Sequence, residues 1–219
     1  MRILNAILDI IFPSRCVSCG ERGVDLCLEC LSESPTAERE TEKWIFSLYD
    51  YRHPPIKKAL WFLKYKGRRK LTQVFAESLY GRIMEELADL STMENFRNPI
   101  LIPIPLAKRR LHERGFNQAE LICQELIKIN NIRHGVYLKL EQDVLIKPKE
   151  TIHQARIENR SARLKNIVGS FAVQNEEKIK NANIILIDDI TTTGATLSEA
   201  KKILRNSGAR KVIAFTVAH

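Results

Sequence analysis

The chain has 219 residues, of which 44% are hydrophobic and 28% charged, and its formal net charge at pH 7 is +9. This apolar content is enough for a packed core, which excludes a chain that lacks a folded core. The length allows one α/β domain with an appendage or two small domains. The positive charge favours anionic partners, whether phosphorylated metabolites, nucleic acid or an acidic membrane surface, without choosing among them.

The first thirteen residues, MRILNAILDIIFP, predict an amphipathic helix with one apolar stripe, formed by Ile3, Leu4, Ile7, Leu8 and Ile11. The segment is too short to span a bilayer, and it lacks the unbroken apolar core and cleavage site of a signal peptide. We expect the helix to dock on its own protein. A peripheral membrane anchor is the alternative, but there is little basic charge on the opposite face. We therefore expect a cytoplasmic protein without a transmembrane segment.

Four of the five cysteines form two CxxC pairs, Cys16 with Cys19 and Cys27 with Cys30. Each pair can form a tight knuckle that points two thiolates at one metal ion, and two knuckles close a tetrahedral site. Gly20 directly follows the first pair, where the knuckle turn needs a permissive backbone. We predict a structural zinc ion with no open position for catalysis. Redox dithiols or disulfides are the alternative, which a cytosolic chain disfavours.

A polar stretch from Leu31 to Lys43 has no apolar periodicity and predicts a linker, which divides the chain into residues 1–43 and 44–219. From Trp44 onward, strand and helix patterns alternate. We predict strands over 45–51, 100–104, 183–189 and 211–217, and helices over 71–90, 117–129 and 195–208. Fully apolar strands joined through helices predict a parallel sheet with right-handed crossovers, which is an α/β fold.

The strand over 183–189 ends on Asp188 and Asp189, and a threonine-rich turn follows it. Open α/β sheets bind ligands at the carboxyl ends of their strands, and two carboxylates suit the vicinal hydroxyls of a ribose. The amides and hydroxyls of residues 192–196, at the start of the next helix, can cradle a phosphate. These features predict a ribose 5-phosphate site. A turn or helix-capping role for the aspartates is the alternative, and a nucleoside-triphosphate P-loop is excluded because its lysine is missing.

The stretch IILIDDITTTGAT, from Ile184 to Thr196, resembles at all thirteen positions the signature of type I phosphoribosyltransferases. Four further segments resemble the ComF/GntX family, whose amidophosphoribosyltransferase-like members are linked to natural competence, natural transformation and DNA uptake. These are the N-terminal ILDIIFP, which departs slightly from the family's LLDxxFP, the two CxxC knuckles, PIPLAKRRLHERGFNQAE and QARIENRSARLKNIVGSF. The resemblance covers essentially the full length. It implies a type I phosphoribosyltransferase-like parallel sheet flanked by helices, with a small N-terminal zinc-binding module.

The resemblance also implies a ligand, 5-phosphoribosyl 1-pyrophosphate (PRPP) with Mg²⁺, and places its parts on this sequence. Asp188 and Asp189 would be the catalytic pair and hold the ribose hydroxyls. The 5-phosphate would lie on Thr192, Thr193, Gly194, Ala195 and Thr196. The pyrophosphate would lie on the loop after an early strand, at Pro105, Leu106, Ala107, Lys108 and Arg109, with Arg110 next to them. Mg²⁺ would bridge pyrophosphate and ribose oxygens with few direct protein ligands.

Type I enzymes carry a mobile catalytic loop where this chain has residues 151–165. Its candidates for closing over the pyrophosphate are Gln154, Arg156, Arg160 and Arg163. A solvated helix face is the alternative for these arginines. No acceptor-binding segment is recognisable, so the acceptor of a phosphoribosyl transfer, and whether the chain catalyses one, stay open.

The segment from Arg52 to Lys70 contains eight basic residues, no acidic ones, and the aromatic residues Trp61, Phe62 and Tyr65. Such a surface can bind single-stranded DNA by phosphate contacts and base stacking. The alternative is an amphipathic helix with the aromatic residues in the core. Two functions therefore stay open: a PRPP-binding protein of the competence machinery, and a non-enzymatic adaptor. The adaptor would bind single-stranded DNA and other competence or recombination proteins, with a regulatory or vestigial PRPP site.

Overall fold

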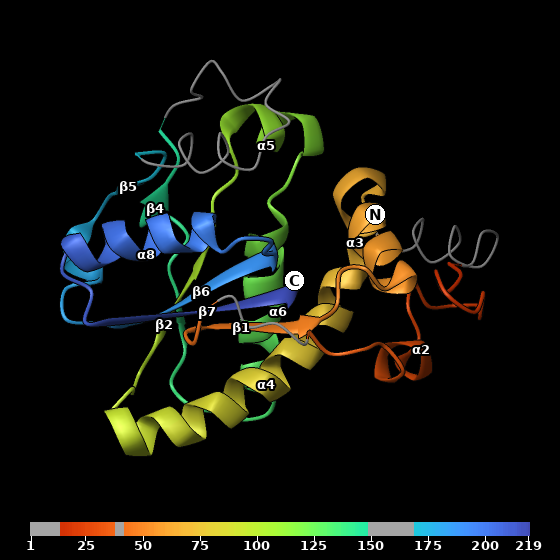
Figure 1. Ribbon diagram of the computed structural model, residues 1–219, viewed down its shortest axis with the longest axis horizontal. Helices are drawn as coiled ribbons and strands as arrows, with labels where there is room; N and C mark the ends of the chain where they lie inside the picture. Colours follow the sequence, from red (N-terminus) through yellow and green to blue (C-terminus); the bar gives the residue numbers. More distant parts are fainter. Residues whose placement is uncertain (1–13, 38–41, 149–168) are drawn as a thin grey trace.

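A five-stranded parallel sheet in the order β1-β7-β6-β2-β3 forms the centre of the computed structural model, which describes residues 14–37, 42–148 and 169–219 (Figure 1). The strands of this sheet are β1 Ile45–Tyr49, β2 Ile100–Pro103, β3 Lys139–Leu140, β6 Asn183–Ile190 and β7 Lys211–Ala218. A separate antiparallel pair consists of β4 Leu145–Ile146 and β5 Ala172–Val173. The predicted α/β class with a parallel sheet is confirmed.

Helices cover both faces of the sheet. The described helices are α2 Leu28–Ser32, α3 Pro54–Lys66, α4 Lys70–Glu94, α5 Lys108–Arg114, α6 Gln118–Ile132 and α8 Ala195–Asn206, with a 3-10 turn, η1, at Glu176–Lys178. Along β6, Ile185 and Ile187 pack in the core that contains α4 and α6, whereas Ile184 and Leu186 pack in the core that contains α8. Figure 1 shows α8 on one side of the sheet and α4 and α6 on the other. Both faces of β6 are buried, which explains its unbroken apolar run.

The predicted helices and long strands lie close to their predicted positions, with shifted ends. The helix predicted over 117–129 begins one residue later, because the Asn117 side chain caps it by accepting a hydrogen bond from the backbone N–H of Ala119 (3.1 Å). The strand predicted over 45–51 ends at Tyr49, where Asp50 turns the chain by accepting a hydrogen bond from the backbone N–H of Arg52 (2.8 Å). Helices α2 and α5 and the two-residue strands were not predicted, and α3 was expected only as the alternative for the segment from Arg52 to Lys70.

The segment with the two CxxC pairs, residues 16–30, is called the cysteine module here, and it packs directly on α3. Its side chains Val17 and Leu26 are buried in the same core as Leu60 of that helix. Lys58 of α3 donates to the carbonyl oxygen of Val17 at 2.9 Å. Arg68, which follows α3, pairs with the buried carboxylate of Asp25 at 3.1 Å. The module therefore braces α3 against the rest of the molecule.

The described part of the predicted linker, residues 31–37, does not run free of the sheet. The Ala37 N–H donates to the Leu48 carbonyl at 3.1 Å, and Thr36 forms a bridge to Tyr49, so this segment lies along β1. Leu31 and Ser34 are buried and hold the segment in place, although its sequence has no apolar periodicity. The domain division at residue 43 stays a prediction, and the helix predicted over 1–13 lies outside the described residues.

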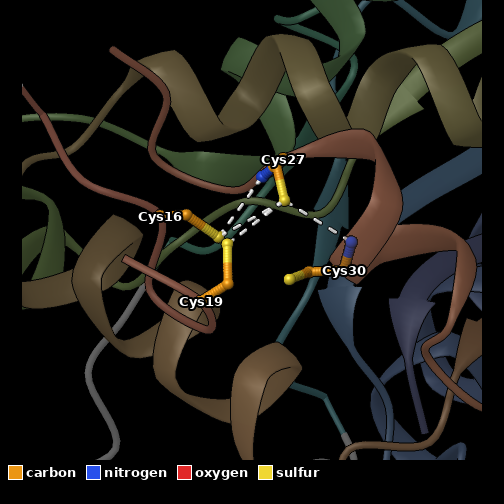
Figure 2. A group of neighbouring side chains, drawn as sticks. All are labelled: Cys16, Cys19, Cys27 and Cys30. Atoms are coloured by element: carbon orange, nitrogen blue, oxygen red, sulfur yellow. Dashed lines mark hydrogen bonds between the residues drawn. The ribbon is translucent and has the colours of Figure 1, made fainter. Parts of the chain in front are cut away.

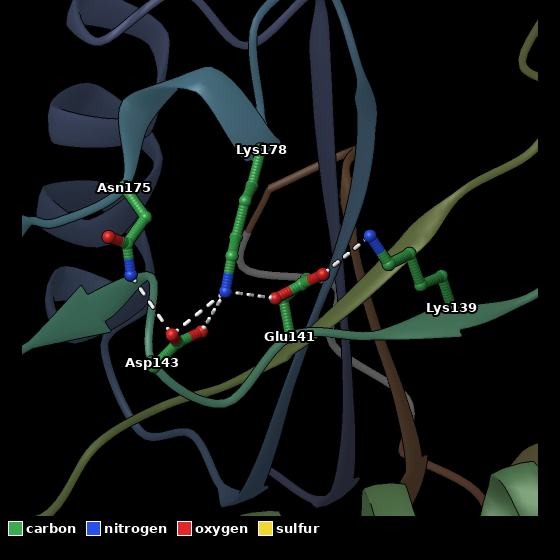
Figure 3. Close-up of polar contacts among 5 residues, drawn as sticks. All are labelled: Lys139, Glu141, Asp143, Asn175 and Lys178. Atoms are coloured by element: carbon green, nitrogen blue, oxygen red, sulfur yellow. Dashed lines mark hydrogen bonds and ion pairs between the residues drawn. The ribbon is translucent and has the colours of Figure 1, made fainter.

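An ion-pair network ties the segment after β3 to η1 (Figure 3). Glu141 is only 7% exposed and accepts from the ammonium groups of Lys139 (2.7 Å) and Lys178 (2.9 Å). Lys178 also pairs with Asp143 at 2.8 Å, and the Asn175 amide donates to the same carboxylate at 2.9 Å. Two cations around one buried carboxylate offset its desolvation, so the network fixes the edge of the sheet at β3.

Candidate functional site

Asp188 and Asp189 lie near the carboxyl end of β6, the middle strand of the sheet. Asp188 pairs in register with Thr216, near the end of β7, and the preceding residue, Ile187, pairs with Pro103, the last residue of β2. The turn that follows is fixed to the end of β7, because the Thr191 N–H donates to the Ala218 carbonyl at 3.0 Å. The acid pair and the turn therefore occupy the carboxyl edge of the sheet, where open α/β sheets bind ligands.

The two carboxylates have different surroundings. Asp189 continues the side of β6 that carries Ile185 and Ile187, and there its Oδ2 lies 2.9 Å from Nζ of Lys64 in α3. Both side chains are largely shielded, with exposed fractions of 10% and 18%. Asp188 accepts a hydrogen bond from the Asp189 N–H at 2.8 Å. Burial, reinforced by the neighbouring charge of Asp189, raises the pKa of Asp188 to about 8.

Lys147, directly after β4, lies within electrostatic reach of Asp188 and Arg110. Burial, followed by repulsion from Arg110, lowers the pKa of Lys147, while the charge of Asp188 acts in the opposite direction. Sequence reasoning did not single out Lys147, and it treated Lys64 only as one of many basic residues. For Lys64 a signal exists, because it follows the buried Leu60 at helical spacing and so faces inward.

The predicted phosphate residues 192–196 form the entry into α8. Gly194 has a left-handed backbone with φ of 71°, which turns the chain from the strand into the helix and which residues with a side chain adopt only with strain. Its carbonyl accepts the first helical bond, from the N–H of Ser198 at 2.8 Å. The hydroxyl of Thr193 lies 3.4 Å from the N–H of Ala195. The first turn of this twelve-residue helix, with its free backbone amides, therefore follows Asp188 and Asp189 closely in the chain.

The predicted pyrophosphate loop follows β2 at the same edge of the sheet. The N–H of Ile104 donates to the Ile187 carbonyl at 2.9 Å, and the Asn117 amide donates to the Ile104 carbonyl at 3.0 Å. Pro105, Leu106 and Ala107 are half-buried, whereas Lys108 and Arg109 are exposed in the first turn of α5. The loop is therefore held next to the end of β6. The predicted mobile-loop residues Gln154, Arg156, Arg160 and Arg163 lie outside the described residues.

The aromatic residues of α3 do not share one environment. Trp61 and Tyr65 are 46% and 60% exposed, so the interpretation that they belong to the core is wrong for these two residues. Phe62 is half-buried under Lys58 and the guanidinium group of Arg68, which lie 5.9 and 4.5 Å from its ring centre. The helix buries Leu60 and its apolar neighbours instead, which leaves two of the three rings on the surface.

The four cysteines of the two CxxC pairs converge, as Figure 2 shows. Their sulfur atoms all lie within 4.8 Å of one another, and Sγ of Cys27 is 3.7 Å from Sγ of both Cys16 and Cys19. A tetrahedral site with zinc–sulfur bonds of about 2.3 Å places its sulfurs about 3.8 Å apart. The backbone N–H groups of Cys27 and Cys30 point at sulfurs, and Gly20 has the permissive backbone expected, with φ of 81°. The cluster can therefore hold a metal ion.

Comparison with known proteins agrees with this fold. Residues 140–219 match the family model of the phosphoribosyl transferase domain, so the class that fold and site define is a protein with a phosphoribosyltransferase fold. The DNA utilization protein YhgH of Salmonella typhimurium is 27% identical over 186 residues, which are 85% of this chain and 74% of the relative. The competence protein ComFC of Bacillus subtilis is 31% identical over 172 residues, covering 78% of this chain and 62% of the relative.

Competence protein F of Haemophilus influenzae is 25% identical over 203 residues, covering 89% of this chain and 81% of the relative. These relatives and the matched domain confirm the resemblance to the ComF family with a phosphoribosyltransferase fold. Among solved structures, a hypoxanthine phosphoribosyl transferase of Trypanosoma cruzi has a TM-score of 0.40 and 12% identity over 66% of this chain and 63% of that chain. Among the described helices, none is both long and apolar enough to cross a bilayer.

Proposed function

We propose that this chain binds PRPP with Mg²⁺ at the carboxyl edge of its sheet and acts, as a ComF-type protein, in natural transformation and DNA uptake on the cytoplasmic side. The observation that carries the proposal is the acid pair Asp188 and Asp189, which lies near the carboxyl end of the buried central strand β6, a few residues before the helix entry at Gly194. The relatives named as competence and DNA utilization proteins support the role in DNA uptake.

In this proposal the ribose hydroxyls lie on Asp188 and Asp189, the 5-phosphate on residues 192–196 and the pyrophosphate on residues 105–109. Carboxylate oxygens are the donors that Mg²⁺ prefers, and the raised pKa of Asp188 marks a carboxyl pair that one ammonium group, that of Lys64, does not neutralise. The acid pair therefore fits a divalent cation, which when bound would offset the charge of the pyrophosphate. Lys147 and Arg110 add positive charge on the Asp188 side.

The parts of PRPP test these assignments separately. Ribose 5-phosphate with Mg²⁺ should raise the melting temperature of the wild type, because a ligand at 100 times its Kd adds about 2.7 kcal/mol to the free energy of unfolding. The Asp188→Asn/Asp189→Asn variant should lose this shift but keep any shift that pyrophosphate alone produces. Asp89→Asn, at an exposed position of α4, is the matched control and should behave as the wild type. An unchanged response to ribose 5-phosphate in the double variant would contradict the assignment.

For the cysteine cluster we infer a structural zinc ion held by Cys16, Cys19, Cys27 and Cys30. The sulfur separations of 3.7 Å support it, because they match the edge of a tetrahedral four-thiolate site. Such a site has no open position, so its contribution is to hold the module in shape. Through the module it also supports α3, which carries Lys64 to the acid pair.

Exposure of Trp61 and Tyr65 favours a second candidate function, the binding of single-stranded DNA by an adaptor. The Lys66 ammonium lies 5.5 Å from the Trp61 ring centre, so positive charge and a stacking surface occur together. The double substitution Trp61→Leu/Tyr65→Leu should weaken binding of an oligothymidine, measured by fluorescence anisotropy, by about tenfold or more, since each base stack contributes about 1–3 kcal/mol. Tyr137→Leu, at another exposed ring, is the control. Equal affinities of the wild type and the double variant would reject this surface.

A further inference from the structure

A pocket of about 400 Å³ lies between the carboxyl end of α3 and α5. Its lining includes Lys64, Tyr65, Arg110, Glu113, Arg114 and Phe116. Apart from Arg110, none of these residues was predicted to hold any part of PRPP. The same Lys64 pairs with Asp189 at 2.9 Å, so the pocket and the acid pair share one residue.

The charges of the lining favour an anion. Three cationic side chains face one carboxylate, that of Glu113, which also accepts a hydrogen bond from Arg109 at 2.8 Å. Arg114 donates one hydrogen bond to the Gln118 side chain at 3.1 Å, and a guanidinium group has five N–H donors. Arginine forks match the oxygens of phosphate and carboxylate groups, and such charge-assisted hydrogen bonds are the strong ones.

One wall of the pocket is aromatic. The Tyr65 ring is 60% exposed, and the Arg114 guanidinium lies 5.2 Å from its centre. Trp61 lies beside it, with ring centres 5.8 Å apart. The exposed ring offers a stacking surface next to the cations. A volume of about 400 Å³ is within the range of small-ligand sites and suits one ring system with an acidic group rather than a polymer.

We propose that this pocket binds an aromatic anion, a flat ring that carries a phosphate or carboxylate group, with the ring on Tyr65 and the anion on Arg114, Arg110 and Lys64. A bound anion then competes with Asp189 for the ammonium group of Lys64. If the acid pair holds ribose hydroxyls, which rests on the proposed function, release of Asp189 from Lys64 frees it to accept a ribose hydroxyl. The two ligands therefore bind cooperatively, and the coupling is reciprocal.

Phenyl phosphate is a suitable probe, because it has the ring and the anion but no ribose for the acid pair to hold. Calorimetric titration into the wild type should show saturable binding, with inorganic phosphate and phenol each binding much more weakly. Arg114→Gln should weaken phenyl phosphate binding by about tenfold, the effect of one charge-assisted hydrogen bond. Tyr65→Leu, at an exposed position, should also weaken it. Arg210→Gln removes the same charge before β7, at an exposed position outside the pocket, and should leave the affinity unchanged.

The Asp188→Asn/Asp189→Asn variant separates this proposal from the PRPP proposal. Removal of Asp189 releases Lys64, so phenyl phosphate should bind this variant at least as tightly as the wild type. A loss of phenyl phosphate binding in this variant would place the probe at the ribose 5-phosphate site and overturn the proposal, as would equal affinities in wild type and Arg114→Gln. If phenyl phosphate binds as expected and PRPP does not bind the wild type, the pocket stands and the proposed function fails.

The coupling has its own readout. Phenyl phosphate at saturation should lower the Kd for PRPP in the wild type several-fold, and Lys64→Gln should abolish this effect because the shared ammonium group is gone. A PRPP affinity in the wild type that does not depend on phenyl phosphate would overturn the coupling.

Discussion

A carboxyl group with a pKa of about 8 lies at the end of the central strand. Burial disfavours the charged form of Asp188, the charge of Asp189 adds to this, and Lys64 offsets it only in part. Because the pKa in the folded protein lies above the ordinary aspartate value of 3.8, the folded state binds more protons than the unfolded state between these two values. The contribution of this group to stability is therefore present at low pH and is lost as the pH rises toward 8.

Asp188→Asn replaces this group with one that does not titrate. The variant and the wild type should have similar melting temperatures at pH 4, where the contribution of Asp188 to stability is still almost fully present. At pH 8.5 the variant should melt higher by several degrees. Only the wild type then has a carboxyl group whose ionisation is less favourable in the folded state than in the unfolded state, which lowers its free energy of unfolding. Thermal denaturation at both pH values measures the difference, with Asp89→Asn as the control. A stability gain that is the same at both pH values would rule out the raised pKa.

Gly135 marks a second place where a single residue is constrained by its surroundings. A Cβ atom there would overlap the Asn130 side chain and the Tyr80 hydroxyl, which hydrogen-bond to each other at 3.2 Å. Gly135→Ala should therefore lower the free energy of unfolding by about 1–3 kcal/mol in urea denaturation. Gly81→Ala is the matched control: its Cβ meets nothing within 4 Å in an exposed helical position, and it should raise stability by up to about 1 kcal/mol. Equal effects of the two substitutions would contradict this packing.

Helix α3 is the element that connects the cysteine module to the acid pair. Its inner face packs on Leu26 of the module, and its last turn carries Lys64 to Asp189. The aromatic residues of α3 could not be assigned from sequence. Trp61 and Tyr65 share one side of the helix and Phe62 lies on another, while the apolar stripe is already filled by Ile56, Ala59, Leu60 and Leu63. The pattern predicts a helix there but leaves its orientation open.

Removal of the metal should lower the stability of the protein through α3. The purified protein should contain one zinc ion per chain, and a chelator should lower its melting temperature, because the proposed metal would hold the module that braces α3. Cys30→Ser should reduce the metal content and lower the melting temperature, whereas Cys123→Ser, in the core of α6, should keep the metal. Elemental analysis with thermal denaturation measures both. A full metal content in Cys30→Ser would exclude the four-thiolate site.

For the whole molecule, the sheet could be predicted because both of its faces are buried and its long strands read as apolar runs. The candidate ribose and phosphate residues could be predicted because they follow one another in a single stretch, from Asp188 to Thr196. The pairing of Lys64 with Asp189 could not, since it joins segments far apart in the sequence and depends on where α3 packs. The pocket beside α5 could not be predicted for the same reason.

The central claim is that the acid pair of β6 belongs to a PRPP site, and a calorimetric titration of PRPP with Mg²⁺ tests it most directly. The wild type should show saturable binding, and Asp188→Asn/Asp189→Asn should lose it, because the substitutions remove both carboxylates that we propose to hold the ribose hydroxyls. Asp89→Asn should bind as the wild type does. Absence of binding to the wild type, or equal binding to the double variant, would contradict the claim.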